Sequence, residues 1–380
     1  MKNQFQLTMA QLNASLGDII NNSKQVYGAW HKAKEANSHM LILPEMFITG
    51  YQVQDLVMKP AFVQEAMFQV NELAKKCKNG PAIGVGAPFR DNTGLYNAFY
   101  ILNSGRVQTI IKKHNFPNEG VFDEVRLYQK TNISGPYKVG EIRIGTPICE
   151  DAWHSDVPEA LVESGAELLV VPNGSPYSRD KMEERISEMV SRVVETQLPL
   201  VYLNMVGGQD DQVFDGGSFV LNPGGQLALS MPLFEESVEH VTFERSKEGW
   251  KALEGNREKS MDSLERDYGA MVLSLRDYVR KTGFSSVVLG LSGGVDSAAV
   301  AAIATDALGP ENVHGIMMPS EFTSQKSLDD AAILADVLGI TLRKIPIDGP
   351  RSAITELLEP IFTGTKTDLT EENIQSRLRG

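Results

Sequence analysis

The stretch from Val287 to Ser297 constrains the fold more than any other part of the chain. It reads Val-Val-Leu-Gly-Leu-Ser-Gly-Gly-Val-Asp-Ser, an apolar β-branched run that ends in a turn rich in Gly and Ser. An Ala-rich helical pattern over 297–308 follows directly. Glycines let backbone N–H groups approach an anion, and the N-terminus of a helix favours negative charge. The order of strand, turn and helix therefore predicts a phosphate-binding site.

Two more apolar runs, at 313–318 and 341–347, follow the strand at 287–291, and helical patterns separate the three. This β-α-β order predicts a parallel, Rossmann-like sheet over residues 284–380. Three strands are fewer than the roughly five or six that an open nucleotide-binding sheet usually has. We therefore expect this second domain to be incomplete in the chain.

The first part of the chain alternates short apolar runs with amphipathic stretches. We predict strands at 5–10, 40–43, 81–86, 96–102, 107–113, 141–148, 168–172, 200–204 and 218–222, with helices at 24–37 and 179–196. Many strands with helices between them favour a layered α/β sandwich over residues 1–243. Residues 244–283 are charged and helix-prone, so we expect a linker and docking helix there.

Composition excludes several classes of protein. A net charge of −13 over 380 residues, without a broad basic patch, argues against a nucleic-acid partner. No stretch is long and apolar enough to predict a membrane span. The two cysteines, Cys77 and Cys149, are too few for a disulfide framework and suit a reducing cytoplasm. The six histidines lack metal-ligand spacing, so we expect neither zinc nor haem.

Three residues near predicted strand ends form a candidate catalytic set. Cys149 lies in a turn after a strand, where a nucleophile can be exposed, but a free thiol needs a base to become thiolate. Glu45 could be that base, and Lys113 could stabilise an oxyanion. Each residue alone also has an ordinary explanation, because cysteines are often core residues and charged residues after strands are often solvated. Cys77 has no acidic neighbour in the sequence, so we predict a structural role for it.

Together these residues resemble the Glu-Lys-Cys triad of the nitrilase, or carbon–nitrogen hydrolase, superfamily. The resemblance covers residues 1 to about 240 and is closest to the glutaminase domain of glutamine-dependent NAD⁺ synthetases. The matching motifs are Leu43-Pro44-Glu45, Thr49-Gly50-Tyr51, Lys113 with 116–124, Ile148 to Trp153, Asn173 to Tyr177, and 207–210 with 214–218. Two departures are Phe116, where the family has Leu, and Glu119, where it has an aromatic residue.

This resemblance implies an αββα sandwich and acyl transfer from glutamine. Glu45 would take the Cys149 proton, and Lys113 with a backbone N–H next to Cys149 would hold the oxyanion. The motif spacing selects Lys113 over Lys112, and strand alternation agrees that only one of them faces the site. The resemblance also implies glutamine-binding roles for four residues, although packing and turn structure explain the first two equally well: Tyr51, Ser175, Glu119 and Lys181.

The turn at 292–297 resembles the S-G-G-x-D-S motif of ATP pyrophosphatase, or PP-loop, ligases, and family resemblance continues to Gly380. It implies that ATP and Mg²⁺ activate the carboxylate of deamido-NAD⁺ as an adenylate, and that ammonia then displaces AMP. We expect ammonia to travel from near Cys149 toward this turn. The residues implied to bind ATP are Ser292, Gly293, Gly294, Val295, Asp296, Ser297 and Ser320, with Asp296 also a Mg²⁺ ligand; Asn373 and Arg377 are implied to bind deamido-NAD⁺.

Three alternatives remain open at this point. The chain could be another PP-loop amidotransferase that acts on a different nucleotide acid. It could show glutaminase or amidase activity alone, because we expect the ligase domain to be incomplete. It could also be a catalytically silent binding or scaffold protein, although the intact set of Glu45, Lys113 and Cys149 argues against this. By analogy with nitrilase-like domains, we expect a homo-oligomer.

Overall fold

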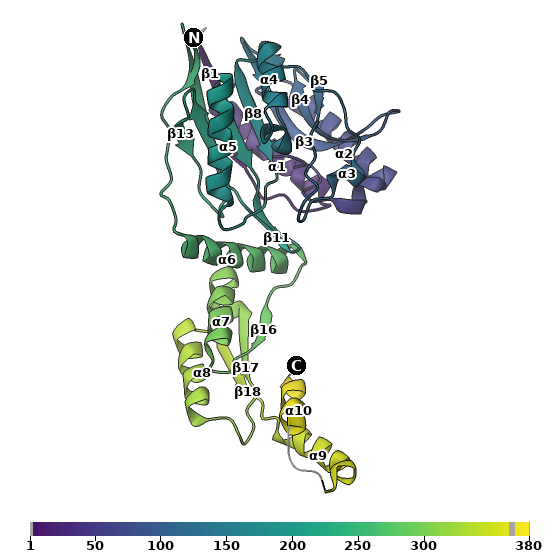
Figure 1. Ribbon diagram of the computed structural model, residues 1–380, viewed down its shortest axis with the longest axis vertical. Coiled ribbons are helices and arrows are strands. Elements are labelled where there is room, and N and C mark those ends of the chain that lie inside the picture. The colour runs from purple at the N-terminus through teal and green to yellow at the C-terminus, as the bar shows by residue number, and fades with distance from the viewer. Residues whose placement is uncertain (1–2, 365–368, 380) are drawn as a thin grey trace. The chain divides into compact units, whose positions relative to one another are not determined.

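The computed structural model describes residues 3–364 and 369–379, and the chain divides into two compact units, residues 1–270 and 271–380 (Figure 1). Two sheets dominate the first unit. The larger sheet has seven strands in the order β15 (Gly249–Ala252), β14 (Ser237–Ser246), β1 (Gln4–Gln11), β2 (Met40–Ile42), β3 (Ala82–Arg90), β4 (Leu95–Asn103) and β5 (Arg106–Lys112). The other has six, in the order β13 (Gln226–Ser230), β12 (Phe219–Asn222), β9 (Leu200–Asn204), β8 (Leu168–Asn173), β7 (Ile142–Gly145) and β6 (Tyr137–Val139).

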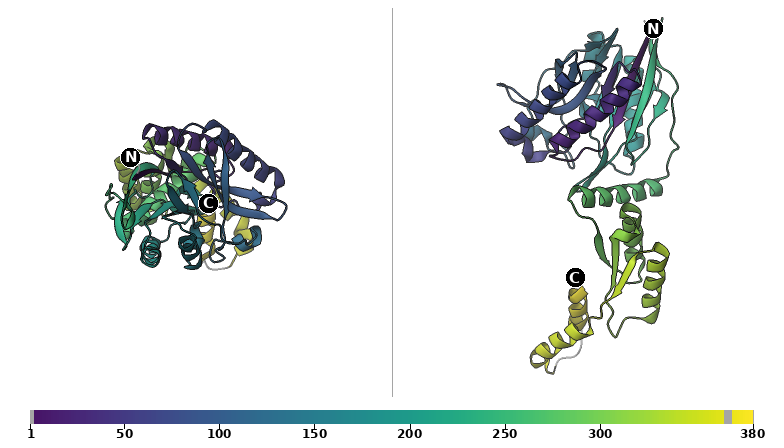
Figure 2. Two further views of the ribbon diagram at one scale, coloured as in Figure 1. Left: turned by 90° about the horizontal axis from the view of Figure 1, so that it is seen from above. Right: turned by 180° about the vertical axis from the view of Figure 1, so that it is seen from behind.

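Helices cover the outer faces of these two sheets. Viewed from above, α1 (Ile19–Glu35) and α2 (Pro60–Lys76) lie on one side of the unit, and α4 (Asp156–Glu163) and α5 (Lys181–Thr196) on the other (Figure 2). The central core contains residues of both sheets, among them Leu7, Phe99, Val170 and Leu203, all fully buried. Because each sheet buries one face against the other and one against helices, central strands such as β8 and β9 are buried on both faces. The predicted αββα sandwich is confirmed.

Strand direction brings the ends of several strands to one edge of the unit. β2 runs parallel to β1 and β3, while β4 is antiparallel to both β3 and β5, so β5 runs in the same direction as β2. In the other sheet β7, β8 and β9 are parallel. Functional groups in α/β folds gather outside the carboxyl ends of such strands. A small hairpin of β10 (Val206–Gln209) and β11 (Gln212–Asp215) adds to this unit.

The predicted linker at 244–283 is wrong over its first nine residues. Residues 244–246 continue β14, and β15 pairs with β14, so that Arg245 lies opposite Trp250 and Phe243 opposite Ala252. Phe243, Trp250 and Ala252 are buried, which is the period-two pattern of a strand. The charged residues between them obscured this pattern in the sequence. The helix α6 begins only at Ser263 and ends at Lys281.

The predicted helix at 24–37 begins earlier than expected, at Ile19. The carboxylate of Asp18 accepts a hydrogen bond from the backbone N–H of Asn21 at 3.2 Å and caps the first turn. Asp is among the preferred N-cap residues because its side chain satisfies an otherwise unpaired N–H group. The start of the helix was therefore present in the sequence as a cap rather than as apolar periodicity.

The second unit contains the predicted parallel sheet, which is confirmed. Its strands lie in the order β16 (Val287–Gly290), β17 (Val313–Met317) and β18 (Thr341–Lys344), both pairs parallel. The helix α7 (Val295–Leu308) contacts β16 and β17, and α8 (Gln325–Leu338) contacts β17 and β18. The short helix η3 (Pro310–Asn312) lies between α7 and β17. The helices α9 (Asp348–Phe362) and α10 (Leu369–Arg379) follow β18.

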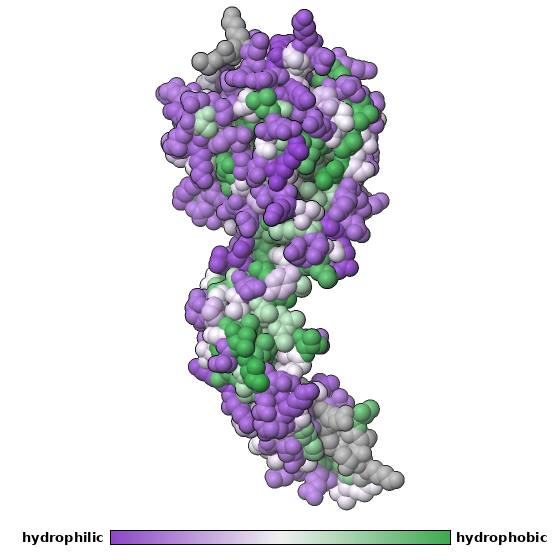
Figure 3. Space-filling view, turned by 90° about the vertical axis from the view of Figure 1, so that its left-hand side faces the viewer, coloured by the Kyte–Doolittle hydropathy of each residue, from purple (hydrophilic) through white to green (hydrophobic). Residues whose placement is uncertain are grey.

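Apolar side chains remain at the surface of the second unit. Val288, Val295, Ile333 and Val337 are each more than half exposed. The space-filling view shows apolar surface on this unit (Figure 3). A small sheet cannot bury all of its apolar residues, because surface area is large relative to volume at this size.

Candidate active site

The first candidate site lies at the carboxyl ends of strands in both sheets of the first unit. Glu45 follows the end of β2 by three residues, and Lys113 directly follows β5. Cys149 begins the short helix η2 (Cys149–Ala152) that comes after β7. The segment at 174–176 directly follows β8. The predicted turn positions therefore come from four different strands and meet at one edge.

Lys113 lies at the centre of this site. Its Nζ is 2.8 Å from Glu45 Oε1 and 2.6 Å from Oε2 of Glu124, and the three side chains are buried. Asn97 Nδ2 donates to both carboxylates, at 2.8 Å to Glu45 and 2.9 Å to Glu124. The backbone N–H of Gly174 donates to the other Glu45 oxygen, Oε2, at 3.0 Å. Both oxygens of the expected base are thus held in place.

Cys149 is buried, with 4% of its surface exposed, and has a φ of +48°. The carboxylate of Asp151, two residues later, ties this turn to the segment after Lys113. It accepts from the backbone N–H of Ile148 at 3.0 Å, of His114 at 3.1 Å and of Asn115 at 2.7 Å. One buried carboxylate therefore connects the cysteine turn with the end of β5.

The charges of this site act on one another. Burial raises the pKa of the Cys149 thiol well above its ordinary value, the charge of Glu45 raises it further, and that of Lys113 opposes the rise. Burial alone would lower the pKa of Lys113, but the charges of Glu124 and Glu45 outweigh it and raise that pKa. Burial also raises the pKa of Glu124, against the charge of Lys113. The resting cysteine is therefore a thiol that needs a base, and the lysine is an ammonium.

The residues expected to bind glutamine are in different surroundings. The Tyr51 hydroxyl donates to Glu124 Oε1 at 3.1 Å, which places it next to the triad. Ser175 is buried and hydrogen-bonded to other protein groups. Lys181 forms an ion pair with Glu184 and lies 4.1 Å from the ring centroid of Trp153. Glu119 is exposed.

Two polar residues of this site had no role in the sequence-based prediction. Glu124 is the last residue of a motif quoted above, and that position was the available signal. Asn97 is the third residue of β4 and lies within its buried stretch from Leu95 to Leu102. A fully buried Asn in such a strand requires polar partners, and this requirement could have marked it as a site residue. The Lys112 side chain, by contrast, forms an ion pair with Asp91 outside the site.

The second candidate site is the turn between β16 and α7. The hydroxyls of Ser292 and Ser297 lie 3.0 Å apart, and the Gly294 N–H donates to the Ser292 hydroxyl at 3.2 Å. Gly293 has a φ of +79°, and a Cβ there would lie 2.2 Å from the carbonyl oxygen of Ser327. A glycine is required at this position for both reasons.

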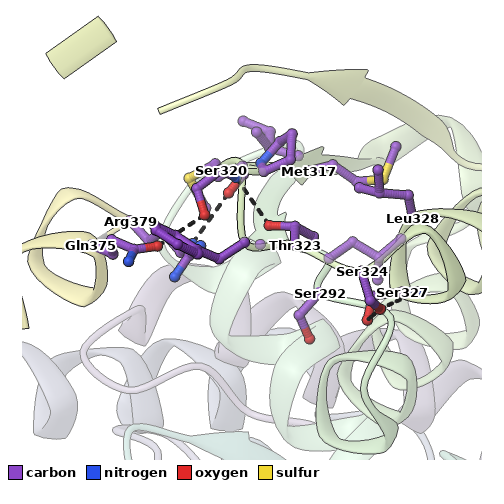
Figure 4. Close-up of a pocket in the computed structure, with 15 residues that line it drawn as sticks. Ser292, Met317, Ser320, Thr323, Ser324, Ser327, Leu328, Gln375 and Arg379 are labelled. Atoms are coloured by element: carbon purple, nitrogen blue, oxygen red, sulfur yellow. Dashed lines mark hydrogen bonds between the residues drawn. The ribbon is translucent and has the colours of Figure 1, made fainter. Parts of the chain in front are cut away.

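A pocket of about 680 Å³ lies beside this turn (Figure 4). Ser292 and Ser320 line it, whereas the other predicted ATP-binding residues, 293–297, do not. The Ser320 hydroxyl donates to Gln375 Oε1 at 2.9 Å, and Arg379 Nε donates to the carbonyl of Met318 at 3.2 Å. The helix α10 therefore contributes one wall of the pocket.

Asn373 and Arg377 are the α10 residues expected to bind deamido-NAD⁺, and this role stays a prediction. Both are exposed, and the α10 residues that line the pocket are Gln375 and Arg379. Residues four apart share one face of a helix, while residues two apart point in nearly opposite directions. Gln375 and Arg379 therefore share the face of α10 that meets the pocket.

Neither a metal cluster nor a membrane helix is found among the residues that the structure describes. Residues 3–364 and 369–379 contain no group of three or more His, Cys, Asp or Glu side chains placed to hold a metal ion. Asp296, the expected Mg²⁺ ligand, is exposed in the first turn of α7. No helix in the same ranges is long and apolar enough to cross a bilayer.

Comparisons with known proteins match both parts of the chain to known families. Family models match the carbon–nitrogen hydrolases over residues 6–249 and NAD synthase over residues 268–380. The glutamine-dependent NAD⁺ synthetase of Rhodobacter capsulatus is 53% identical over the whole chain, which covers 69% of that relative. The chain belongs to the glutamine-dependent NAD⁺ synthetase family.

Solved structures show the same family likeness. The glutamine-dependent NAD⁺ synthetase of Acinetobacter baumannii, determined with ADP, superposes with a TM-score of 0.92 at 34% identity, over 99% of this chain and 71% of that one. An amidase of the nitrilase superfamily from Nesterenkonia sp. AN1 has a TM-score of 0.57 at 20% identity, over 64% of this chain and 91% of that one. This second likeness concerns the fold alone.

Proposed function

We propose that the first unit hydrolyses the side-chain amide of glutamine with Cys149 as nucleophile, Glu45 as general base and Lys113 as oxyanion donor. The observation that supports this most strongly is the buried ammonium of Lys113, which contacts two carboxylates beside the cysteine turn. A buried charge is costly unless it is paired and hydrogen-bonded. Here it is paired and also available where negative charge develops on the amide oxygen.

The proposed steps follow from the charges of the site. Since burial keeps Cys149 protonated, Glu45 takes its proton as the sulfur attacks the amide carbon. Lys113 and a backbone N–H next to Cys149 stabilise the oxyanion of the tetrahedral intermediate. Glu45 returns the proton to the leaving nitrogen, and ammonia departs. Glu45 then deprotonates a water, which attacks the thioester carbon. The C–S bond breaks, glutamate leaves, and the proton on Glu45 returns to the Cys149 sulfur.

We further propose that the second unit binds ATP in the pocket beside the turn at 292–297. Ser292, Ser320 and Arg379 offer polar groups to a nucleotide there. Asp296 would share Mg²⁺ with the phosphates, since Mg²⁺ is commonly held by one or two carboxylates plus substrate oxygens. The carboxylate of deamido-NAD⁺ attacks the α-phosphate and releases pyrophosphate. Ammonia then displaces AMP from the acyl-adenylate and gives NAD⁺.

The location and assembly of the protein belong to the same proposal. Two cysteines, both free and buried, suit a reducing cytoplasm. A homo-oligomer remains a prediction from the fold.

The decisive experiment is incubation of the chain with glutamine, ATP, Mg²⁺ and deamido-NAD⁺, with glutamate and NAD⁺ both quantified. The proposal for the first unit requires glutamate release that Cys149→Ala abolishes. Glutamate release that survives this substitution would exclude Cys149 as the nucleophile. Other small amides in place of glutamine distinguish a glutaminase from a general amidase.

A further inference from the structure

A buried ion pair outside the triad has no role in the steps above. Arg185 lies on α5 and Asp215 at the end of β11, and Nη1 of the arginine is 2.8 Å from each oxygen of the aspartate. The two side chains have 0% and 2% of their surfaces exposed. Removal of two charges from water has a large desolvation cost, so such a pair is poor evidence for stability by itself. Its other contacts indicate what it does.

The remaining donors of Arg185 all bind the segment after β8. Nε donates to the Ser175 hydroxyl at 3.1 Å, and Nη2 donates at 2.9 Å to the carbonyl oxygens of Ser175 and Pro176. Asn204 strengthens the same arrangement, since its Nδ2 donates to the Ser175 carbonyl at 3.0 Å and to Asp215 at 3.2 Å. The guanidinium therefore fixes the backbone of 175–176 from one side.

This backbone leads directly to the general base. Gly174 precedes Ser175, and its N–H is the donor to Glu45 Oε2 at 3.0 Å. A Cβ at Gly174 would lie 2.4 Å from the Tyr51 ring, so the backbone is packed closely here as well. The other Glu45 oxygen is occupied by Lys113 and Asn97. The position of the 174–176 segment therefore sets the rotation of the Glu45 carboxylate.

We propose that Arg185 and Asp215 are positioning residues that orient Glu45 toward Cys149 through the backbone of residues 174–176. The hydrogen bonds that the structure gives to these two side chains go to groups other than Glu45, Lys113 and Cys149. The charge of Arg185 also acts on Cys149, and Arg185→Lys keeps that charge. The inference rests on the proposed glutaminase function, because it assigns a purpose to the same base. It gives a reason why all three nitrogen atoms of the buried Arg185 guanidinium donate hydrogen bonds to Asp215 and to residues 175–176.

The test measures how fast chloroacetamide alkylates Cys149 in the full chain, with peptide mass spectrometry to separate Cys149 from Cys77. Alkylation requires thiolate, so its rate reports how well Glu45 removes the proton. The variants are Arg185→Lys, Glu45→Gln and the double substitution. Arg192→Lys is the matched control, because Arg192 is also a mostly buried arginine on α5, and its ion pair is with Glu195 instead.

We expect Arg185→Lys to slow alkylation roughly tenfold to hundredfold, the effect of one lost hydrogen bond to a charged group. Arg192→Lys should change the rate less than twofold. In the Glu45→Gln background the Arg185 substitution should slow alkylation no further, because the base through which it acts is already absent. In glutamine hydrolysis, kcat should fall by a similar factor while KM stays within about twofold.

Other outcomes would overturn the inference. An unchanged rate in Arg185→Lys, or an equal further loss in the Glu45→Gln background, means that Arg185 does not act through Glu45. A rise in KM with constant kcat means that it acts on substrate binding. If Arg185→Lys does not fold, Asp215→Asn allows the same cycle, because it removes the other half of the ion pair. Failure of the wild-type chain to release glutamate would instead refute the proposed function itself.

Discussion

The charged residues of the first site are buried together, and each charge is stabilised by a partner of opposite charge. Lys113 is an ammonium with no exposed surface, and it is stable there only because Glu45 and Glu124 lie within 2.8 Å of its Nζ. Removal of one partner from a buried pair leaves an uncompensated charge, and this costs more than the pair itself contributes. Substitution of such a side chain should therefore change stability as well as the proposed activity.

Lys113→Met should therefore lower both activity and stability. We expect a loss of unfolding free energy of about 3–5 kcal/mol, because two carboxylates remain buried without a cation. Urea denaturation measures this loss, and glutamate release should fall at least a hundredfold when corrected for folded protein. Lys112→Met is the control, since its ion pair with Asp91 is partly exposed and such pairs contribute about 0–1 kcal/mol. Equal losses in the two variants would contradict the assignment.

Asp151 should make stability depend on pH. Burial raises its pKa from 3.8 to about 6, although three backbone N–H donors oppose this. Because the folded state then keeps its proton to higher pH than the unfolded chain, unfolding free energy falls as pH rises between these values. A pKa rise from 3.8 to about 6 corresponds to a change of about 3 kcal/mol in the free energy of unfolding.

The measurement compares wild type with Asp151→Asn by urea denaturation from pH 4 to pH 7. The stability difference, wild type minus variant, should decrease by up to about 3 kcal/mol over this range. A constant or increasing difference would show that the carboxyl does not titrate as the structure indicates. The Asn variant should also release glutamate more slowly, because one carboxylate joins the cysteine turn to the end of β5.

At the scale of elements, turns between strands and helices hold the candidate functional groups. The turn at 292–297 depends on the close approach of its backbone to α8 at Gly293. The helix α10 contributes the Gln375 and Arg379 side chains to the adjacent pocket. Both contacts join segments that are distant in the sequence, so the pocket exists only when the elements have packed.

Gly293→Ala should displace this turn and weaken ATP binding at least tenfold. A left-handed conformation costs a residue with a Cβ about 1–2 kcal/mol, and the added carbon also collides with Ser327. Calorimetric titration with ATP and Mg²⁺ measures the change. Gly349→Ala is the matched control, because open space surrounds that position and the first turn of α9 accepts Ala readily. ATP affinity that is equal in the two variants would exclude the turn from the nucleotide site.

At the scale of the whole molecule, the chain joins two units with separate hydrophobic cores. Separate cores allow each unit to keep its fold when the chemistry of the other is removed. Cys149→Ala should therefore abolish glutamate release and leave ATP affinity within about twofold of wild type. Glutamate assays and calorimetric titration on the same preparation test both parts. A large loss of ATP affinity in this variant would show that the units are not independent.

Short-range sequence patterns were sufficient to predict many of the strands, helices and turns of this molecule. The turn after 287–291, the strand at 200–204 and the positions of Glu45, Lys113 and Cys149 after strands follow from short-range periodicity and motifs, which depend on neighbours in the sequence. Residues 244–252 were misassigned because charged side chains concealed a period-two pattern.

Only the tertiary structure decided which polar groups meet. Glu124, Asn97 and Arg185 acquire their partners from strands and loops that sheet pairing brings together. The same holds for Gln375 and Arg379, whose side of α10 is set by packing. Sequence alone determined where these turns lie, because backbone preferences act over a few residues. The pairing of buried charges needed the assembled fold, because burial and a partner a few ångströms away are properties of packed elements.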